Sequence, residues 1–301
     1  MSIVVRFIQP FEYAAATAIH NADNEPHFQI TAEQLQLSEH QMTNGSRLVA
    51  VQNDSVIGTA EFWLWSEAQA FRIGIHAFES TQLEAQHLLL EEIEKQASSQ
   101  GIKRLLATVR SDFLENAPFL KFGFVEVFRS FGANLELKDF DPQRFAQLES
   151  ALNAQSITIK SYSDLENDPQ RAIKLEAIQQ QALEDMPSYE PVVTASLDYK
   201  NRNLWEPFFV AVRGDEYLGF GSLDGKPENS VVYFDASGVS RLHRKQGIGL
   251  ALAAKLVVWA KQSGFAELND GGARSNAAHI SILQKLGFEL EPDWVTLEKL
   301  M

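Results

Sequence analysis

The sequence predicts an α/β chain, of the α+β kind, made of two tandem copies of one domain. Its 301 residues exceed the roughly 100–150 residues of a typical single domain. Strand-type and helix-type hydrophobic patterns alternate in both halves, and the landmarks of the first half recur in the same order in the second. Because 45% of the residues are hydrophobic, each half is able to bury a core.

The first half divides into strands and helices by its apolar periodicity. Residues 24–44 show neither pattern clearly. Asn53-Asp54 is a turn signal between two strands, and Gly101 is the residue expected just past a helix end. Asp112 is a candidate cap for a short helix. The predicted elements are a strand at 3–7, a helix at 11–21, a hairpin of strands at 47–51 and 55–65, a strand at 71–76, a helix at 82–100, a strand at 103–109 and a strand ending at 137.

The second half repeats these landmarks in register. The triplet Val-Ala-Val at 49–51 and again at 210–212 is followed in each case by a glycine nine positions after the first valine. The helix-ending glycines, Gly101 and Gly264, come 43 and 45 positions later, and a Gly-Phe pair follows them after 22 and 23. Four landmarks in nearly the same spacing indicate an internal repeat.

Three segments follow from the repeat. The first copy is expected to span residues 1–138 and the second copy residues 156–301. Between them, residues 139–155 contain an apolar-periodic run that predicts a connecting helix. The second copy then begins with a predicted strand at 157–161.

The segment from Ser237 to Leu256 carries the main functional signal. A β-type run stops at a basic, glycine-containing turn, and an alanine- and leucine-rich helix begins. Gly247 and Gly249 would leave the backbone N–H groups of the first helical turn open to a ligand. Those N–H groups and the helix dipole attract an anion. Arg244 and Lys245 precede the glycines, so the segment predicts an anion-binding helix start.

Residues 244–249, Arg-Lys-Gln-Gly-Ile-Gly, resemble the (Gln or Arg)-x-x-Gly-x-(Gly or Ala) signature of the GNAT N-acetyltransferase superfamily. Ser237-Gly238-Val239 is similar to the end of the family's fourth strand. Asn276 and residues 285–288 are similar to its last helix and the turn beyond. The resemblance covers residues 156–301, and it extends to residues 1–138 through architecture alone, in a tandem arrangement similar to mycothiol synthase-like bacterial acetyltransferases. It implies two GNAT-like domains, each a mixed, mostly antiparallel twisted sheet flanked by helices.

The resemblance also implies an activity. It implies an acetyl-CoA-dependent N-acetyltransferase, an acyltransferase that moves an acetyl group to a primary amine of a small, cationic molecule. The amine would attack directly, without a covalent enzyme intermediate. An alternative is a non-catalytic acyl-CoA-binding or regulatory protein that keeps the binding site alone. By the resemblance, the residues that hold acetyl-CoA are Val239, Arg241, Arg244, Lys245, Gln246, Gly247, Ile248, Gly249, Leu250 and Asn276.

Acid–base candidates are less defined. Asp235, on the predicted fourth strand, is the nearest acidic candidate for deprotonating the amine, with Glu184 or Asp185 and a water relay as alternatives. Many family members place a tyrosine, the general acid, where this chain has leucine at position 283. His279 and Ser281 on the same segment are candidate substitutes, or the thiolate leaves into solvent.

The first copy differs at the corresponding helix start. Counting back from the helix-ending glycines places Glu84 where the second copy has Gly247, and Gln86 where it has Gly249. A carboxylate there would repel a pyrophosphate by about 1 kcal/mol or more even at the dielectric of water. We therefore expect a degenerate first copy that does not bind coenzyme A and acts as a scaffold, a wall of the substrate cleft or a dimer surface.

Composition excludes several other classes. The chain has no cysteine, which rules out disulfides and a cysteine nucleophile and favours a cytoplasmic location. The net charge of −14 disfavours nucleic acid as a partner, and no apolar run long enough to cross a membrane is present. The seven histidines are scattered without zinc spacing, so no metal site is expected. We expect a small-molecule partner and a monomer or homodimer.

Overall fold

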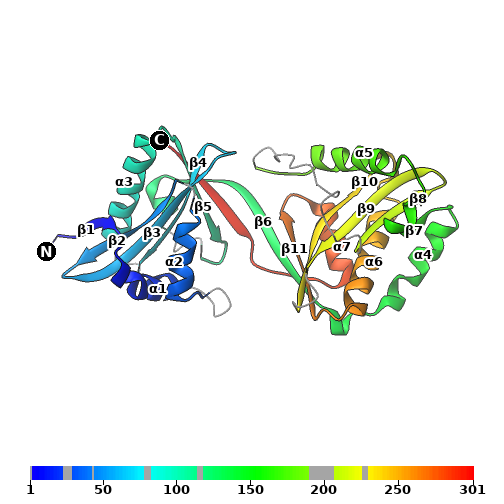
Figure 1. Ribbon diagram of the computed structural model, residues 1–301, viewed down its shortest axis with the longest axis horizontal. Coiled ribbons are helices and arrows are strands. Elements are labelled where there is room, and N and C mark those ends of the chain that lie inside the picture. The colour runs from blue at the N-terminus through cyan, green and yellow to red at the C-terminus, as the bar shows by residue number, and fades with distance from the viewer. Residues whose placement is uncertain are drawn as a thin grey trace. The chain divides into compact units, whose positions relative to one another are not determined.

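The computed structural model divides the chain into two compact units (Figure 1). The first unit comprises Met1–Phe128 together with Trp294–Met301, and the second comprises Arg129–Asp293. The structure describes residues 2–22, 29–42, 44–77, 83–113, 118–189, 207–225 and 230–301. None of the helices in these ranges is long and apolar enough to cross a membrane.

The first unit contains a mixed sheet. Its neighbouring strands are antiparallel, except that β4 and β5 are parallel. The parallel pairing is short, and it joins residues 71–73 to residues 105–107. The strand order is β1 (Val4–Phe7), β2 (Ser46–Gln52), β3 (Ser55–Trp65), β4 (Ala70–Ala77), β5 (Arg104–Arg110) and β13 (Trp294–Leu300).

Helices cover both faces of this sheet. Helix α3 (Leu83–Ser99) packs on one face, and α1 (Tyr13–Ala22) and α2 (Ala32–His40) lie on the other (Figure 1). The residue pattern did not predict α2. Its start is a capping box, in which Thr31 accepts from the backbone of Gln34 and the Gln34 side chain accepts from the backbone of Thr31. The Thr-x-x-Gln spacing was the available signal.

The second unit repeats this arrangement. Its strands pair antiparallel, except that β10 and β11 pair in parallel over residues 231–233 and 267–269. Strand β6 begins in the first unit and pairs with β11 from Ser130 onward. A short strand, β12 (Glu289–Leu290), also pairs with β6. The strand order is β7 (Thr158–Ser161), β8 (Phe208–Arg213), β9 (Glu216–Asp224), β10 (Val231–Val239), β11 (Glu267–Ala273) and β6 (Val125–Glu136).

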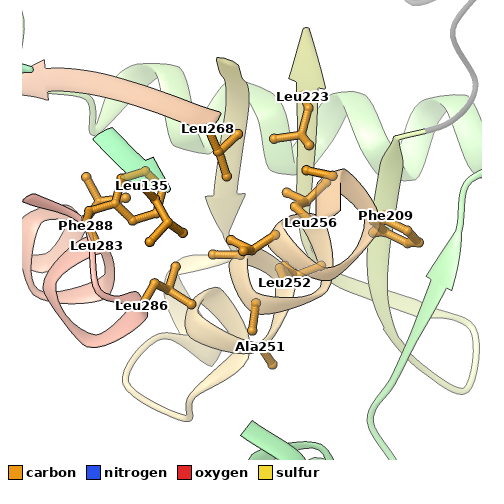
Figure 2. Packing of buried hydrophobic residues seen from close by; sticks show 14 of the residues in the cluster. Leu135, Phe209, Leu223, Ala251, Leu252, Leu256, Leu268, Leu283, Leu286 and Phe288 are labelled. Atoms are coloured by element: carbon orange, nitrogen blue, oxygen red, sulfur yellow. The ribbon is translucent and has the colours of Figure 1, made fainter. Parts of the chain in front are cut away.

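The core of the second unit fixes helix α6 (Ile248–Gln262) against the sheet. Leu252 and Leu256 of α6 are buried among residues of β6, β8, β9 and β11 and of helix α7 (Ala277–Leu286), as Figure 2 shows. Fully burying one leucine contributes about 1.5–3 kcal/mol. Helix α4 (Ala146–Asn153) packs on the same face, and α5 (Arg171–Glu184) covers the other. The start of α6 is therefore held in place by a dry core.

The predicted repeat is confirmed at the level of single contacts. A Cβ placed on Gly58 would lie 3.2 Å from Leu89 of α3, and one placed on Gly219 would lie 3.2 Å from Leu252 of α6. With Leu89 matched to Leu252, five of the six buried residues of α3 fall on buried residues of α6, and the sixth, Gln86, falls on Gly249. The same glycine approach to a helix therefore occurs in both units.

The chain passes from the first compact unit to the second between residues 128 and 129, and returns to the first between residues 293 and 294. The sequence suggested other boundaries, with a first copy at 1–138, a connecting segment at 139–155 and a second copy at 156–301. Where each repeated copy begins and ends remains a prediction. The connecting segment contains the short 3-10 helix Pro142–Phe145 and then α4.

The helix start that Asp112 was expected to cap falls on residues 114–117, which lie outside the described residues, so this cap stays a prediction. The Asp112 carboxylate accepts from the guanidinium of Arg110 at 2.8 Å. The short helix is the 3-10 segment Phe119–Phe122, and Pro118 occupies its N-cap position.

Candidate coenzyme-binding and catalytic site

The turn between β10 and α6 has the geometry of an anion site. A 3-10 turn, Arg241–His243, leads to Gly247, which has a φ of 85° and is the N-cap of α6. Glycine adopts this left-handed conformation without the clash that a Cβ creates. Because Gly247 has no side chain to accept from the first helical turn, the leading N–H groups of α6 remain available to an outside acceptor. We call residues 244–250 the cradle.

Both glycines of the cradle also allow close packing. A Cβ on Gly249 would lie 3.2 Å from Cδ1 of Ile282 and 3.6 Å from Cγ2 of Val239. One on Gly247 would lie 2.8 Å from Cδ1 of Leu148. Larger residues at either position would therefore disturb the helix start as well as fill it.

The two central strands of the second unit, β10 and β11, separate from each other close to the cradle. Beyond Tyr233, β10 continues against β9, and beyond Asn269, β11 continues against β6. We call residues 234–239 of β10 and 270–273 of β11 the fork. A strand edge that faces such a gap has backbone groups able to pair with an extended ligand. Val239 ends β10 and lies against Gly249, so the fork and the cradle adjoin.

Residues 175–288, which include the cradle and the fork, match the family model described as the acetyltransferase (GNAT) family. These residues form a GNAT acetyltransferase domain. The prediction from the signature at 244–249 is thereby confirmed.

Solved structures share the fold over nearly the whole chain. A GCN5-related N-acetyltransferase from Sphaerobacter thermophilus is 16% identical, with 99% of this chain and 95% of that chain covered and a TM-score of 0.68. A tandem GNAT protein from the clavulanic acid biosynthesis pathway is 15% identical, with 99% and 98% covered and a TM-score of 0.60. The predicted fold class is confirmed by these likenesses.

A third structure is a GCN5-related glucosamine N-acetyltransferase region of a fungal multi-domain GH3 β-N-acetylglucosaminidase. It is 13% identical, covers 99% of this chain and 38% of that chain, and has a TM-score of 0.71. A search of curated protein sequences found no match.

Asp235 of the GNAT domain lies in the fork on the face that α5 covers. The hydroxyl of Ser222, on β9, donates to Oδ2 of Asp235 at 2.9 Å. The neighbouring Ala236 packs with Ala182 of α5 in the small apolar cluster on that face. The predicted base candidate is thus a half-buried carboxylate with a defined position. Ser222 was not predicted, because its partner is thirteen positions away on another strand.

His279 of the GNAT domain lies on the opposite face of the sheet, where α6 and α7 pack. Its Nε2 is 3.0 Å from Oδ2 of Asp270, the first residue of β11 past the parallel pairing. The Asp270 side chain is 6% exposed, so this carboxylate faces the imidazole with little water around it. The sequence offered no signal for Asp270, since the two residues come from different elements.

Leu283 lies one helical turn after His279 on α7 and is fully buried in the core. The position that holds a tyrosine in many family members is therefore apolar and dry here. Asn276, another predicted site residue, is the N-cap of α7 and accepts from the backbone N–H of His279. It thereby fixes the start of the helix that carries His279.

Two arginines at the start of the cradle and just before it, Arg244 and Arg241, are paired with acidic residues at the end of α5. Arg241 donates to Glu184 and Asp185, and Arg244 donates to Asp185 at 2.6 Å and to the carbonyl of Val239 at 3.0 Å. Hydrogen bonds from the two guanidiniums hold the pKa of Asp185 well below its ordinary value. A carboxylate that binds protons so weakly is a poor general base, which disfavours the alternative base at Asp185.

Proposed function

We propose that the second unit transfers an acetyl group from acetyl-CoA to a primary amine of a small, cationic molecule. The observation that carries this proposal is the glycine-capped start of α6, which adjoins the fork within a GNAT domain. The acidic chain, with a net charge of −14, attracts cationic acceptors. We further propose that the protein acts in the cytoplasm, as its lack of cysteine favours.

The cradle suits a pyrophosphate, because the backbone N–H groups that open α6 lie beside two positions without a Cβ, and Arg244 and Lys245 precede them in the chain. Gln246, Ile248 and Leu250 would supply backbone donors, and Lys245 and Arg244 would supply charge. The edge of β10 at Val239 would pair with the pantetheine arm. This pairing would require the Arg244 guanidinium to release the Val239 carbonyl, to which it donates a hydrogen bond here. Arg241, held by Glu184 and Asp185, would shape the outer wall.

Bound acetyl-CoA would supply an activated acyl group as a thioester. Asp235 would accept the proton that the attacking amine loses, and Ser222 would orient its carboxylate. His279 would give a proton to the departing sulfur, with Asp270 beside it to stabilise the protonated imidazole. Asp235 and His279 lie on opposite faces of the sheet. The amine would therefore lose its proton on one face, and the sulfur would receive a proton on the other.

Leu283 favours a second candidate, a non-catalytic acyl-CoA-binding or regulatory protein. This leucine stands where many family members have the tyrosine that acts as general acid, and its buried hydrocarbon side chain cannot donate a proton. Both candidates require binding of acetyl-CoA, and only the enzyme requires turnover.

A thermal-shift titration combined with a thiol-release screen tests both candidates. Acetyl-CoA is expected to raise the melting temperature, and at least one amine among polyamines, aminoglycosides, amino acids and peptide N-termini is expected to cause release of coenzyme A. Gly249→Gln, which introduces the residue found at the matching position of α3, is expected to abolish both effects. Stabilisation without turnover across the panel would favour the non-catalytic candidate. The absence of any shift would contradict both.

We propose that the first unit does not bind coenzyme A. Glu84 lies exposed in the first turn of α3, and the matching position to Gly249 is the buried Gln86. A negative charge and a larger side chain thus replace the two glycines. One acetyl-CoA per chain is the expected stoichiometry.

A further inference from the structure

The first unit contains a cluster of possible metal ligands on the face that α1 covers. His20 of α1, Glu61 of β3 and His76 of β4 each offer one ligand atom, and these three atoms lie within 4.8 Å of one another. Nε2 of His76 is 3.5 Å from Oε1 of Glu61. The rings of His20 and His76 have centroids 4.5 Å apart.

Gly74, on β4, makes room for this cluster. A Cβ on Gly74 would overlap Oε1 of Glu61 and would lie 2.9 Å from its Cδ and 3.4 Å from Nε2 of His76. Glu61 is 9% exposed, so its carboxylate has little freedom to move aside. The position of the carboxylate therefore depends on the absence of a side chain at residue 74.

The cluster lies where the first unit has its own split between central strands. The parallel pairing of β4 with β5 ends at Ile73, and Gly74 and His76 come after it. Glu61 follows Gly58 by three positions, as Ser222 follows Gly219. The first unit thus carries a histidine–carboxylate cluster at the place where the second unit carries Ser222 and Asp235.

The charges around the cluster suit a cation. Arg47 forms an ion pair with Oε2 of Glu61, which leaves Oε1 toward His76. Glu39 accepts from the backbone of Arg47 and adds a second carboxylate. Glu39 and Glu61 thus bring two negative charges against the positive charge of Arg47.

We propose that His20, Glu61 and His76 bind a divalent transition-metal ion, and that Zn²⁺ fits them best. Two imidazole nitrogens and one carboxylate oxygen form a known ligand set for zinc, with a fourth position left for water or a ligand. Metal–ligand bonds of about 2.0–2.2 Å place tetrahedral ligand atoms roughly 3.3–3.6 Å apart, close to the 3.5 Å between His76 and Glu61. Small side-chain rotations would bring in His20.

The histidines gave no sequence signal because they are 56 positions apart, one on a helix and one on a strand. Sequence motifs for zinc rely on ligands close together in the chain.

Titration with Co²⁺ after dialysis against a chelator tests the proposal, because four-coordinate Co²⁺ absorbs strongly in the visible range. We expect one Co²⁺ per full-length chain, displaced by Zn²⁺ in the same stoichiometry. His20→Ala and His76→Ala are expected to weaken binding at least 100-fold. Gly74→Ala keeps all three ligands but displaces the carboxylate, and it is expected to weaken binding at least 10-fold.

His87→Ala is the matched control, since His87 is an exposed histidine of the same unit that lies beside Glu91. Its variant is expected to bind Co²⁺ as the unchanged protein does. Circular dichroism of each metal-free variant checks folding, and His76→Asn serves if His76→Ala unfolds. The proposal is overturned if no visible band appears, or if the band persists in folded His20 and His76 variants. Acetyl-CoA plays no part in this readout.

Discussion

Gly247 and Gly264 share a backbone conformation, with φ values of 85° and 89°, but differ in their surroundings. A Cβ on Gly247 would meet Leu148 at 2.8 Å, whereas one on Gly264 would have no heavy atom within 4 Å. Left-handed backbone costs any other residue about 1–2 kcal/mol. Alanine at either position would introduce backbone strain, but only alanine at 247 would also alter the proposed ligand site. Comparing the two variants therefore separates the two effects.

Gly247→Ala and Gly264→Ala are both expected to lower the melting temperature by several degrees, at about 2–4 °C per kcal/mol. Only Gly247→Ala is expected to weaken acetyl-CoA binding, by at least 10-fold, because only that methyl group enters the cradle. Differential scanning fluorimetry and isothermal titration calorimetry measure the two effects. Equal loss of acetyl-CoA affinity in both variants would argue against the cradle.

His279 and Asp270 permit a second test at the residue scale. General acid catalysis contributes roughly 10²–10⁴-fold, so His279→Gln is expected to lower kcat about 100-fold with little change in KM for acetyl-CoA. Asp270→Asn is expected to lower kcat about 10-fold, since the imidazole remains but loses the facing carboxylate.

The control for these variants is Glu267→Gln, which changes a carboxylate on the same strand outside the fork. Steady-state thiol release with the best acceptor gives kcat and KM for each variant. A His279→Gln enzyme with unchanged kcat would show that the thiolate leaves into solvent without this donor.

Helices α3 and α6 are equivalent elements with different starts. Both pack a leucine, Leu89 or Leu252, against a glycine of the third strand of their unit. At their starts, however, α6 has Gly247 where α3 has Glu84. Both copies have the same leucine–glycine packing, but only the second has the glycine on which the proposed site depends.

Leu89→Ala and Leu252→Ala are each expected to destabilise their own unit by about 2–5 kcal/mol, because each side chain is fully buried. Leu252→Ala is also expected to weaken acetyl-CoA binding, while Leu89→Ala leaves it unchanged. Urea unfolding and calorimetric titration provide the two measurements. Weaker acetyl-CoA binding in Leu89→Ala would indicate a second site, in the first unit.

The sequence predicted most elements because their hydrophobic periodicity is strong, as in α3 and α6. It missed α2, whose residues are mostly polar and whose capping box was the main signal. The cradle was predictable because its residues are contiguous. Asp270, Ser222 and Glu61 were not, because a pairing between strands or between a strand and a helix depends on register that a single sequence does not display.

The two units are not consecutive pieces of chain. Strand β13 completes the sheet of the first unit beside β5, and the later residues of β6 complete the sheet of the second beside β11. A single cut in the connecting segment would therefore leave each half without one strand. Residues 1–138 alone would lack β13, and residues 156–301 alone would lack β6.

Deletion of residues 294–301 is expected to destabilise the first unit, because it uncovers β5 and removes the buried Val295 and Leu297. Hydrogen exchange should show lost protection in β5, with β10 and α6 still protected. Glu298→Gln, which removes one ion pair with Arg104 but keeps the strand, is the milder control. Lost protection confined to the second unit would contradict the assignment of β13.

The place of β13 also has a consequence for synthesis on the ribosome. N-terminal domains usually fold first as the chain emerges. Here the N-terminal sheet stays open at β5 until residues 294–301 have left the exit tunnel, after the whole second unit has been made. The half that is translated first is thus the last to become complete, and during that interval β5 is an exposed strand edge that a chaperone could cover.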